Sequence, residues 1–211
     1  MTILYEDNEI IVCVKPSGMQ SQGGKSDAVA YLNGYFAENS SDATAYPVHR
    51  LDKETGGVMV FAKNSKSAAE LSKQISNNEV KKHYFAVING SPEENSGVLK
   101  DLLFHDRQKN KTYTVKRSRK GVKEASLEYV TVSEREGLSL LDILLHTGRT
   151  HQIRVQFASR KLPLYGDGKY GGGSGKLALF AYKLEFRHPT TGKKMTFAAE
   201  PDKNEYPWNL F

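Results

Sequence analysis

The sequence predicts an α+β fold, in which a few flanking helices pack on a largely antiparallel, mixed sheet. Many short segments rich in β-branched and aromatic residues follow one another without regular helices between them, as in antiparallel sheets. The chain has 211 residues, a length typical of one domain, and it contains no internal repeat and no low-complexity linker. We therefore expect residues 1–211 to form a single domain.

The expected strands are short apolar runs bounded by turn residues. They lie at 10–15, 57–63, 82–88, 98–104, 125–132, 138–146 and 176–186. Two helices are expected, one after Ser26-Asp27 and one capped by Asn64, because apolar side chains recur there at helical spacing. The segment 150–159 is ambiguous, since its apolar residues alternate as in a strand while Thr150 is a good helix N-cap.

Composition excludes several classes of protein. Hydrophobic residues make up 38% of the chain, which excludes wholesale disorder. No apolar run approaches the ~18–20 residues of a membrane span, and acidic residues follow the first five residues, unlike in a signal peptide. The single cysteine, Cys13, cannot form an internal disulfide. We expect a cytoplasmic protein that has no membrane partner.

The positive charge is concentrated in one segment. The net charge is +6, and subtracting the eight cations of 107–123 leaves −2 for the rest of the chain. Gly121 and the alternating residues 112–115 predict that this basic run forms an exposed hairpin. Two interpretations stay open, a phosphate-binding arm or a solvated edge that prevents strand pairing. Its cations are Arg107, Lys109, Lys111, Lys116, Arg117, Arg119, Lys120 and Lys123.

Motifs for cofactors and metals are missing from the sequence. Gly18–Ser26 resembles a phosphate-binding loop, but its spacing is one residue too long. A nucleotide hydrolase based on Gly24-Lys25-Ser26 therefore stays only a weak alternative. The six histidines have no metal-ligand spacing, and Cys13 is isolated. We expect chemistry carried out by side chains alone, with no cofactor and no metal.

Asp52 is the candidate functional carboxylate. It lies between Arg50 and Lys53, directly before the turn Thr55-Gly56-Gly57 and an apolar strand. Neighbouring cations keep a carboxylate ionised, as a nucleophile requires. An ordinary loop salt bridge would show the same charge pattern, so charge alone leaves both interpretations open.

Four ordered motifs resemble those of the RluA-type pseudouridine synthases, from about residue 3 to about residue 200. They are the strand and turn IIVCVKPSG (10–18), the catalytic-type segment HRLD with the following threonine, glycine and strand (49–63), the strand KHYFAV (82–87), and TGRTHQIR with the following LYGD and YG (147–171). Gly56 stands where the family usually has serine, and Phe180 where it often has histidine. We expect a catalytic domain without the S4-like RNA-binding module that many relatives carry.

The resemblance implies the pseudouridine synthase fold with a central RNA-binding cleft, and isomerisation of uridine to pseudouridine without a cofactor. It implies that Asp52 is the catalytic carboxylate, that Arg154 pairs with Asp52, and that Tyr84 stacks on the uracil. The uridine must then be flipped out of its helix, with Arg50 filling the vacated space or binding a phosphate. Lys82, Arg149 and the basic run are the expected backbone contacts.

The expected partner is ribosomal or transfer RNA, and the expected state is a monomer with no obligate protein partner. A non-catalytic RNA-binding or RNA-folding module on the same scaffold is the alternative function. The two hypotheses differ on Asp52, which only the enzyme needs.

Overall fold

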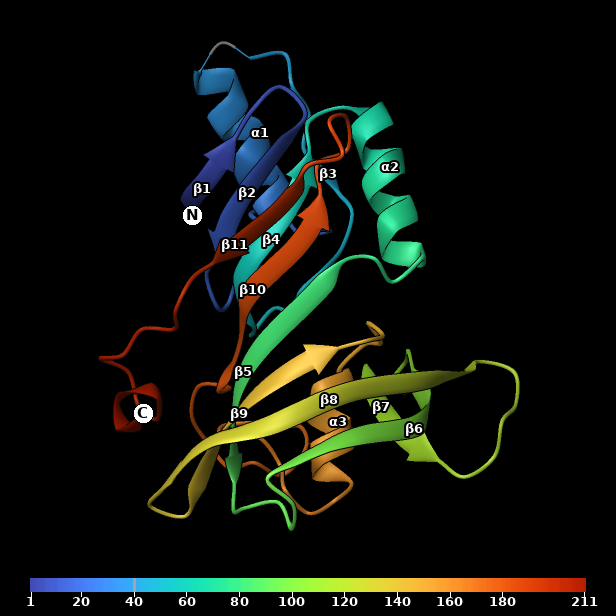
Figure 1. The fold of residues 1–211 in the computed structure, drawn as a ribbon, viewed down its shortest axis with the longest axis vertical. Coiled ribbons are helices and arrows are strands. Elements are labelled where there is room, and N and C mark those ends of the chain that lie inside the picture. The colour runs from blue at the N-terminus through green and yellow to red at the C-terminus, as the bar shows by residue number, and fades with distance from the viewer. Residues whose placement is uncertain (40) are drawn as a thin grey trace. The chain divides into compact units, whose positions relative to one another are not determined.

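Strands β5 (Lys81–Asn89) and β10 (Leu179–Arg187) are the two elements in which the chain passes between its two structural units (Figure 1). A computed structural model describes residues 1–39 and 41–211. Unit 1 contains residues 1–82 and 181–201, and unit 2 contains residues 83–180 and 202–211. The expectation of a single domain over the whole chain stays a prediction, as does the central cleft.

Unit 1 is a sheet covered by two helices. Its strand order is β1-β2-β4-β10, with β11 beside β10 and β3 beside β4. The elements are β1 (Thr2–Glu6), β2 (Ile10–Lys15), α1 (Ala28–Glu38), β3 (Tyr46–Pro47), β4 (Gly56–Ala62), α2 (Ser65–Ser76) and β11 (Lys194–Ala198). Every residue of β4 is buried. Because side chains of a strand alternate between the two faces, both faces of this sheet are covered.

The two predicted helices are confirmed, and each begins at a side-chain cap. The Asp27 carboxylate accepts the N–H of Ala30 at the start of α1, and the Asn64 carbonyl accepts the N–H of Ser67 at the start of α2. Leu71 of α2 is fully buried in a cluster with Val58 and Val60 of β4. The apolar stripe that predicted α2 is therefore the face that packs on the sheet.

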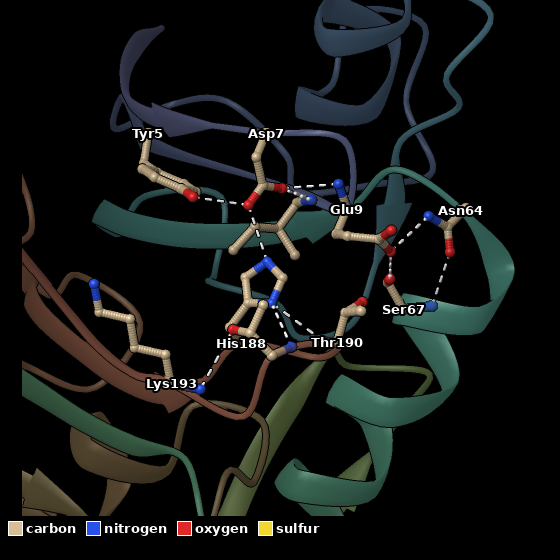
Figure 2. A network of polar contacts seen from close by, with 10 residues as sticks. Tyr5, Asp7, Glu9, Asn64, Ser67, His188, Thr190 and Lys193 are labelled. Atoms are coloured by element: carbon tan, nitrogen blue, oxygen red, sulfur yellow. Dashed lines mark hydrogen bonds and ion pairs between the residues drawn. The ribbon is translucent and has the colours of Figure 1, made fainter.

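A polar network ties the β1–β2 turn to the β10–β11 turn within unit 1, as Figure 2 shows. The backbone N–H groups of Thr190 and Thr191 donate to Nδ1 of His188, so the ring proton is on Nε2, which lies 2.9 Å from Asp7 Oδ2. Burial raises the pKa of Asp7, but the backbone N–H groups of Ile10 and Glu9 outweigh it and hold the pKa below its usual value. Asp7 is thus an ionised acceptor that joins the two turns.

Unit 2 contains a second set of strands in the order β5-β9-β8-β6-β7. Its elements besides β5 are β6 (Ser96–Asp106), β7 (Lys111–Val115), β8 (Val122–Arg135), β9 (Leu138–Leu145), α3 (Gln152–Ala158) and the 3-10 turn Trp208–Leu210. The pairs β6–β7, β6–β8 and β8–β9 are antiparallel. The predicted α+β class, with a largely antiparallel sheet and flanking helices, is confirmed.

The ambiguous segment 150–159 forms helix α3. All six residues from Gln152 to Phe157 are buried. Because the helix has no exposed face here, the alternation of apolar and polar residues does not indicate a strand. The helix begins at His151, in the left-handed conformation with φ 54° and without a side-chain cap. The expectation that Thr150 is the N-cap is therefore wrong. Val155 packs against Leu103 of β6 and Ala125 of β8.

The basic run does not form one hairpin, and this expectation is corrected. Strand β7 pairs with β6, not with β8, and β6 lies between them. The run therefore covers the β6–β7 turn (107–110), strand β7, and a loop (116–121) that crosses over the end of β6 to reach β8. All of its cations except Lys111 are exposed.

No helix in the described part of the chain combines the length and the apolar composition needed to cross a membrane.

Candidate active site

Asp52 lies on the loop between β3 and β4 of unit 1. Its carbonyl accepts the N–H of Thr55 at 3.1 Å, which closes the turn into β4. The side chains of Leu51 and Thr55 are buried, with exposures of 4% and 2%, while that of Asp52 is half-buried. The two buried neighbours anchor the turn and leave the carboxylate at the surface of unit 1.

A fully buried lysine fastens this loop to the preceding turn. The Lys15 ammonium, at the end of β2, donates to the carbonyls of Pro16 at 2.9 Å, Met19 at 2.7 Å and Lys53 at 3.3 Å. Burial lowers the pKa of Lys15 to about 8, and the negative charge of Asp52 acts in the opposite direction. At neutral pH, Lys15 is therefore a buried cation next to the loop that carries Asp52.

Further bonds from the same turn hold the Asp52 loop on both sides. The Ser21 hydroxyl donates to the Leu51 carbonyl at 2.9 Å and accepts the Leu51 N–H at 3.0 Å. The N–H of Gly18 donates to the Lys53 carbonyl at 2.8 Å. Because the backbone on both sides of Asp52 is bound, its carboxylate starts from a fixed position, as a catalytic group requires.

His49 supports the loop from the other side. Its Nε2 accepts the N–H of Val60 in β4 at 3.1 Å, so the ring proton is on Nδ1. Burial, with a smaller contribution from the charge of Lys82, lowers the pKa of His49 to about 3. The imidazole is thus neutral and acts as a structural acceptor at neutral pH.

Gly57, the second of the two glycines after Thr55, is required by its surroundings. It has φ 130°, and a Cβ built on it would lie 2.3 Å from the carbonyl oxygen of Ala181. Only glycine allows this approach of β4 to β10. The start of the central strand β4, next to the Asp52 loop, therefore depends on this residue.

Arg154 is held by Asp167 in unit 2. Its Nε and Nη2 donate to the two carboxylate oxygens at 2.7 and 2.8 Å, and both side chains are buried, with exposures of 4% and 0%. The guanidinium also lies over the ring of Tyr170, 5.3 Å from its centroid. The Nε–Nη2 edge of the guanidinium is therefore bound to Asp167.

The structure places the predicted site residues in two groups. Asp52, the exposed Arg50 and the half-buried Lys82 belong to unit 1, whereas Tyr84, Arg149, Arg154 and the basic run belong to unit 2. Tyr84 is 7% exposed on β5. Within unit 2, Arg107, Lys123 and Arg149 line one pocket. The meeting of Asp52, Tyr84 and Arg154 stays a prediction.

Sequence reasoning gave no role to several residues that support these side chains. Lysine is almost never fully buried unless it is paired, so Lys15 at the end of an apolar strand was the available signal. Asp167 belongs to the LYGD motif, and only its tertiary contact identifies it as the partner of Arg154. His49 gave no signal beyond its place beside Arg50.

Comparisons with known proteins identify the family of the chain. A model of the RNA pseudouridylate synthase family matches residues 9–159. An uncharacterized RNA pseudouridine synthase of Aquifex aeolicus is 35% identical over 232 residues, covering 99% of this chain and 72% of that protein. The ribosomal large subunit pseudouridine synthase C of Buchnera aphidicola subsp. Schizaphis graminum is 31% identical over 211 residues, covering 95% of this chain and 67% of that protein.

A solved structure shows the same fold. The human RNA pseudouridylate synthase domain containing 4 has a TM-score of 0.81 at 24% identity, covering 95% of this chain and 89% of the human chain. The chain spans about two thirds of the length of the Buchnera relative and of a Mycoplasma pneumoniae relative. Family match and sequence identity together confirm the resemblance of the four motifs: the chain belongs to the RluA-type RNA pseudouridylate synthase family, whose members are isomerases that act on RNA.

Proposed function

We propose that this chain isomerises uridine to pseudouridine within structured ribosomal or transfer RNA, with Asp52 as the catalytic carboxylate. The observation that carries the proposal is the bracing of the Asp52 loop. Lys15 and Ser21 bind the backbone carbonyls on either side of Asp52, and His49 accepts the N–H of Val60 in the following strand β4. The Asp52 carboxylate itself is half-buried. An ordinary surface salt bridge does not need a loop held by so many hydrogen bonds. A group that must meet a substrate in one geometry does.

The proposed reaction needs no co-reactant. The bond between uracil N1 and ribose C1′ breaks, the base turns, and a new bond forms between C5 and C1′. The proton at C5 leaves and N1 gains one, so the product is an isomer of the substrate. Asp52 attacks C1′, adds to uracil C6 or abstracts a ribose proton, and all three routes require an ionised carboxylate.

The other predicted residues have positioning roles in this proposal. Arg154 binds and holds Asp52, because a planar guanidinium can bind a carboxylate through two parallel hydrogen bonds. Tyr84 stacks on the uracil, where its hydroxyl is suited to removing the C5 proton. The uridine is flipped out of its helix, which costs a few kcal/mol of stacking. Arg50, exposed beside Asp52, fills the vacated space or binds a phosphate.

The RNA class is proposed from two observations. The Buchnera relative is named a ribosomal large subunit pseudouridine synthase, which makes large-subunit ribosomal RNA the first substrate to test. The exposed cations of the basic run suit the RNA backbone, because phosphate contacts orient RNA without reading its sequence. We place the enzyme in the cytoplasm, as a monomer without an obligate protein partner.

The test is to map pseudouridine across total cellular RNA with and without this protein, and to repeat the mapping with Asp52→Asn. We expect at least one site that depends on the wild-type protein and is lost in the variant. RNA affinity of the variant should stay within about threefold of the wild type, because a single carboxyl group changes to an amide of the same shape. A wild-type protein that forms no pseudouridine on any RNA, but still binds RNA, would support the non-catalytic alternative instead.

A further inference from the structure

Unit 2 contains a pocket that the predicted catalytic residues do not use. It has a volume of about 590 Å³, which lies within the usual range for small-molecule sites. It is formed by the end of β6, the start of the β6–β7 turn, Gly121 and Lys123 around the start of β8, and the turn 148–150 before α3. Neither Tyr84 nor Arg154 lines it. The predicted uracil-stacking residue and the predicted partner of Asp52 are thus not among the residues that form it.

The pocket carries positive charge. Arg107, Lys123 and Arg149 line it, and Asp106 is the acidic residue among its lining groups. The Asp106 carboxylate is committed to the β6–β7 turn, where Oδ1 accepts the backbone N–H groups of Gln108 at 3.0 Å and Lys109 at 3.1 Å. Arg149 is anchored by its Nε, which donates to the Glu124 carbonyl at 2.9 Å. This arrangement suits an anion such as a phosphate group.

One wall of the pocket offers an oriented hydrogen-bond acceptor. The hydroxyl of Thr112 donates to the carbonyl of Thr150 at 2.8 Å, and a carbonyl can only accept. The same hydroxyl oxygen must therefore accept from Nδ1 of His105, which lies 3.1 Å away. The proton of the neutral His105 ring is consequently on Nδ1, and Nε2 carries the lone pair. His105 lines the pocket together with the three cations, and its Nε2 is an atom that can accept an N–H of a base.

The loop 116–121 completes the pocket from the side of the basic run. The Arg119 guanidinium lies over the ring of Phe104, 5.1 Å from its centroid, which fixes the loop against β6. Gly121 has φ 87°, and a Cβ there would lie 3.5 Å from the same ring. Phe104 and Gly121 both line the pocket. The fixed end of the loop is therefore part of the pocket wall, while Lys116, Arg117 and Lys120 lie outside it.

We propose that this pocket binds a second, unpaired nucleotide of the RNA, whose base meets His105 and whose phosphate meets Arg107, Lys123 and Arg149. As the source of that nucleotide is the RNA substrate, the inference rests on the proposed function. It adds a specificity site to it, because an RNA must present an unpaired nucleotide at a fixed distance from the target uridine. Basic residues outside the pocket then contact only the neighbouring phosphates.

The probes are the four ribonucleoside 5′-monophosphates, inorganic phosphate and a single-stranded RNA octamer of mixed sequence. Binding to the wild-type protein is followed by amide chemical shifts of Thr112, Gly121 and Thr150. We expect a nucleotide to shift these amides, inorganic phosphate to bind at least tenfold more weakly, and the octamer to bind more tightly than any mononucleotide. Equal affinity for phosphate and nucleotides, no shift with any nucleotide, or an octamer weaker than the mononucleotides would overturn the proposal.

Two double variants that remove equal charge distinguish binding in the pocket from non-specific electrostatic attraction to the basic run. Arg107→Gln/Lys123→Gln removes two pocket cations, and Arg117→Gln/Lys120→Gln removes two from the same run outside it; all four side chains are exposed, so folding should be kept. We expect the first pair to weaken mononucleotide binding at least tenfold more than the second. Equal weakening would sink the inference. Pseudouridine formation is measured separately. If the enzyme is active but the two double variants bind nucleotides equally well, only this inference is refuted. If the pocket binds nucleotides but no pseudouridine forms, only the proposed function is refuted.

Discussion

His49 should make unit 1 unusually sensitive to mild acid. In the folded chain its Nε2 accepts the N–H of Val60, and burial lowers its pKa to about 3 from 6.5. Protonation of Nε2 would break this bond and bury a charge. The perturbation to test is a change from pH 7 to pH 5 in the wild type and in His49→Gln, whose side chain can still accept a hydrogen bond but does not titrate.

The magnitude follows from proton linkage. A folded-state pKa below the unfolded one means that the unfolded chain binds the proton first, so the stabilisation is complete above about pH 6.5 and is lost as the pH falls toward 3. At pH 5 the unfolded histidine is almost fully protonated and the folded one is not. The loss of free energy of unfolding between pH 7 and pH 5 from this residue is therefore about 2 kcal/mol.

The assay is urea denaturation at both pH values and equal ionic strength, together with native-state hydrogen exchange of peptides from β4, which reports on unit 1. We expect the stability of the wild type to fall by about 2 kcal/mol more than that of His49→Gln. The matched control is His146→Gln, in which a side chain that is 40% exposed is replaced and His49 is kept. Equal pH dependence of wild type and His49→Gln, within about 0.5 kcal/mol, would refute the argument that His49 is a neutral acceptor in the folded chain.

Two further predictions concern unit 2. Asp167→Asn removes one charge of the buried pair with Arg154 and should lower the free energy of unfolding by about 3–5 kcal/mol, because it breaks a buried ion pair. A loss below about 1 kcal/mol in urea denaturation would mean that the pair is solvated like a surface salt bridge. Replacing Lys116, Arg117 and Lys120 by Gln should weaken RNA binding and reduce the slope of log affinity against log salt by about 0.7–0.9 for each lost phosphate contact, with turnover at saturating RNA kept. Unchanged affinity would identify the basic run as a solvated edge.

Local chemistry explains which elements the sequence could predict. Residues 10–15 form the predicted strand β2 to the residue, and Asp27 and Asn64 cap the two predicted helices. Elsewhere the observed strand ends differ from the predicted ones by up to three residues. Strand β10, for example, was predicted to begin at residue 176 and begins at Leu179. Strands β1, β3 and β11 were not predicted. Their burial patterns are mixed or mostly half-exposed, so they lack the continuous apolar runs that revealed the central strands.

The candidate site divides in the same way. Asp52, Tyr84 and Arg154 were found through motifs, which are local in sequence, and their meeting stays a prediction. The partners that hold them are not local. The Lys15 ammonium reaches the carbonyl of Lys53, 38 residues away, and Arg154 binds Asp167 across a turn. No pattern within a short window specifies such contacts.

By itself, therefore, the sequence determined the fold class, the central strands, the two capped helices, the family and the identity of the candidate catalytic residues. These depend on periodicity, caps and motifs, which a chain carries along its length. Tertiary structure decided that 152–158 is a helix, because complete burial removes the amphipathic period that distinguishes helix from strand. It also decided that β7 pairs with β6 rather than β8, and that Lys15 is a buried cation beside the Asp52 loop. Pairing and burial are set by which segments meet in space, and that information is not present in any one of them.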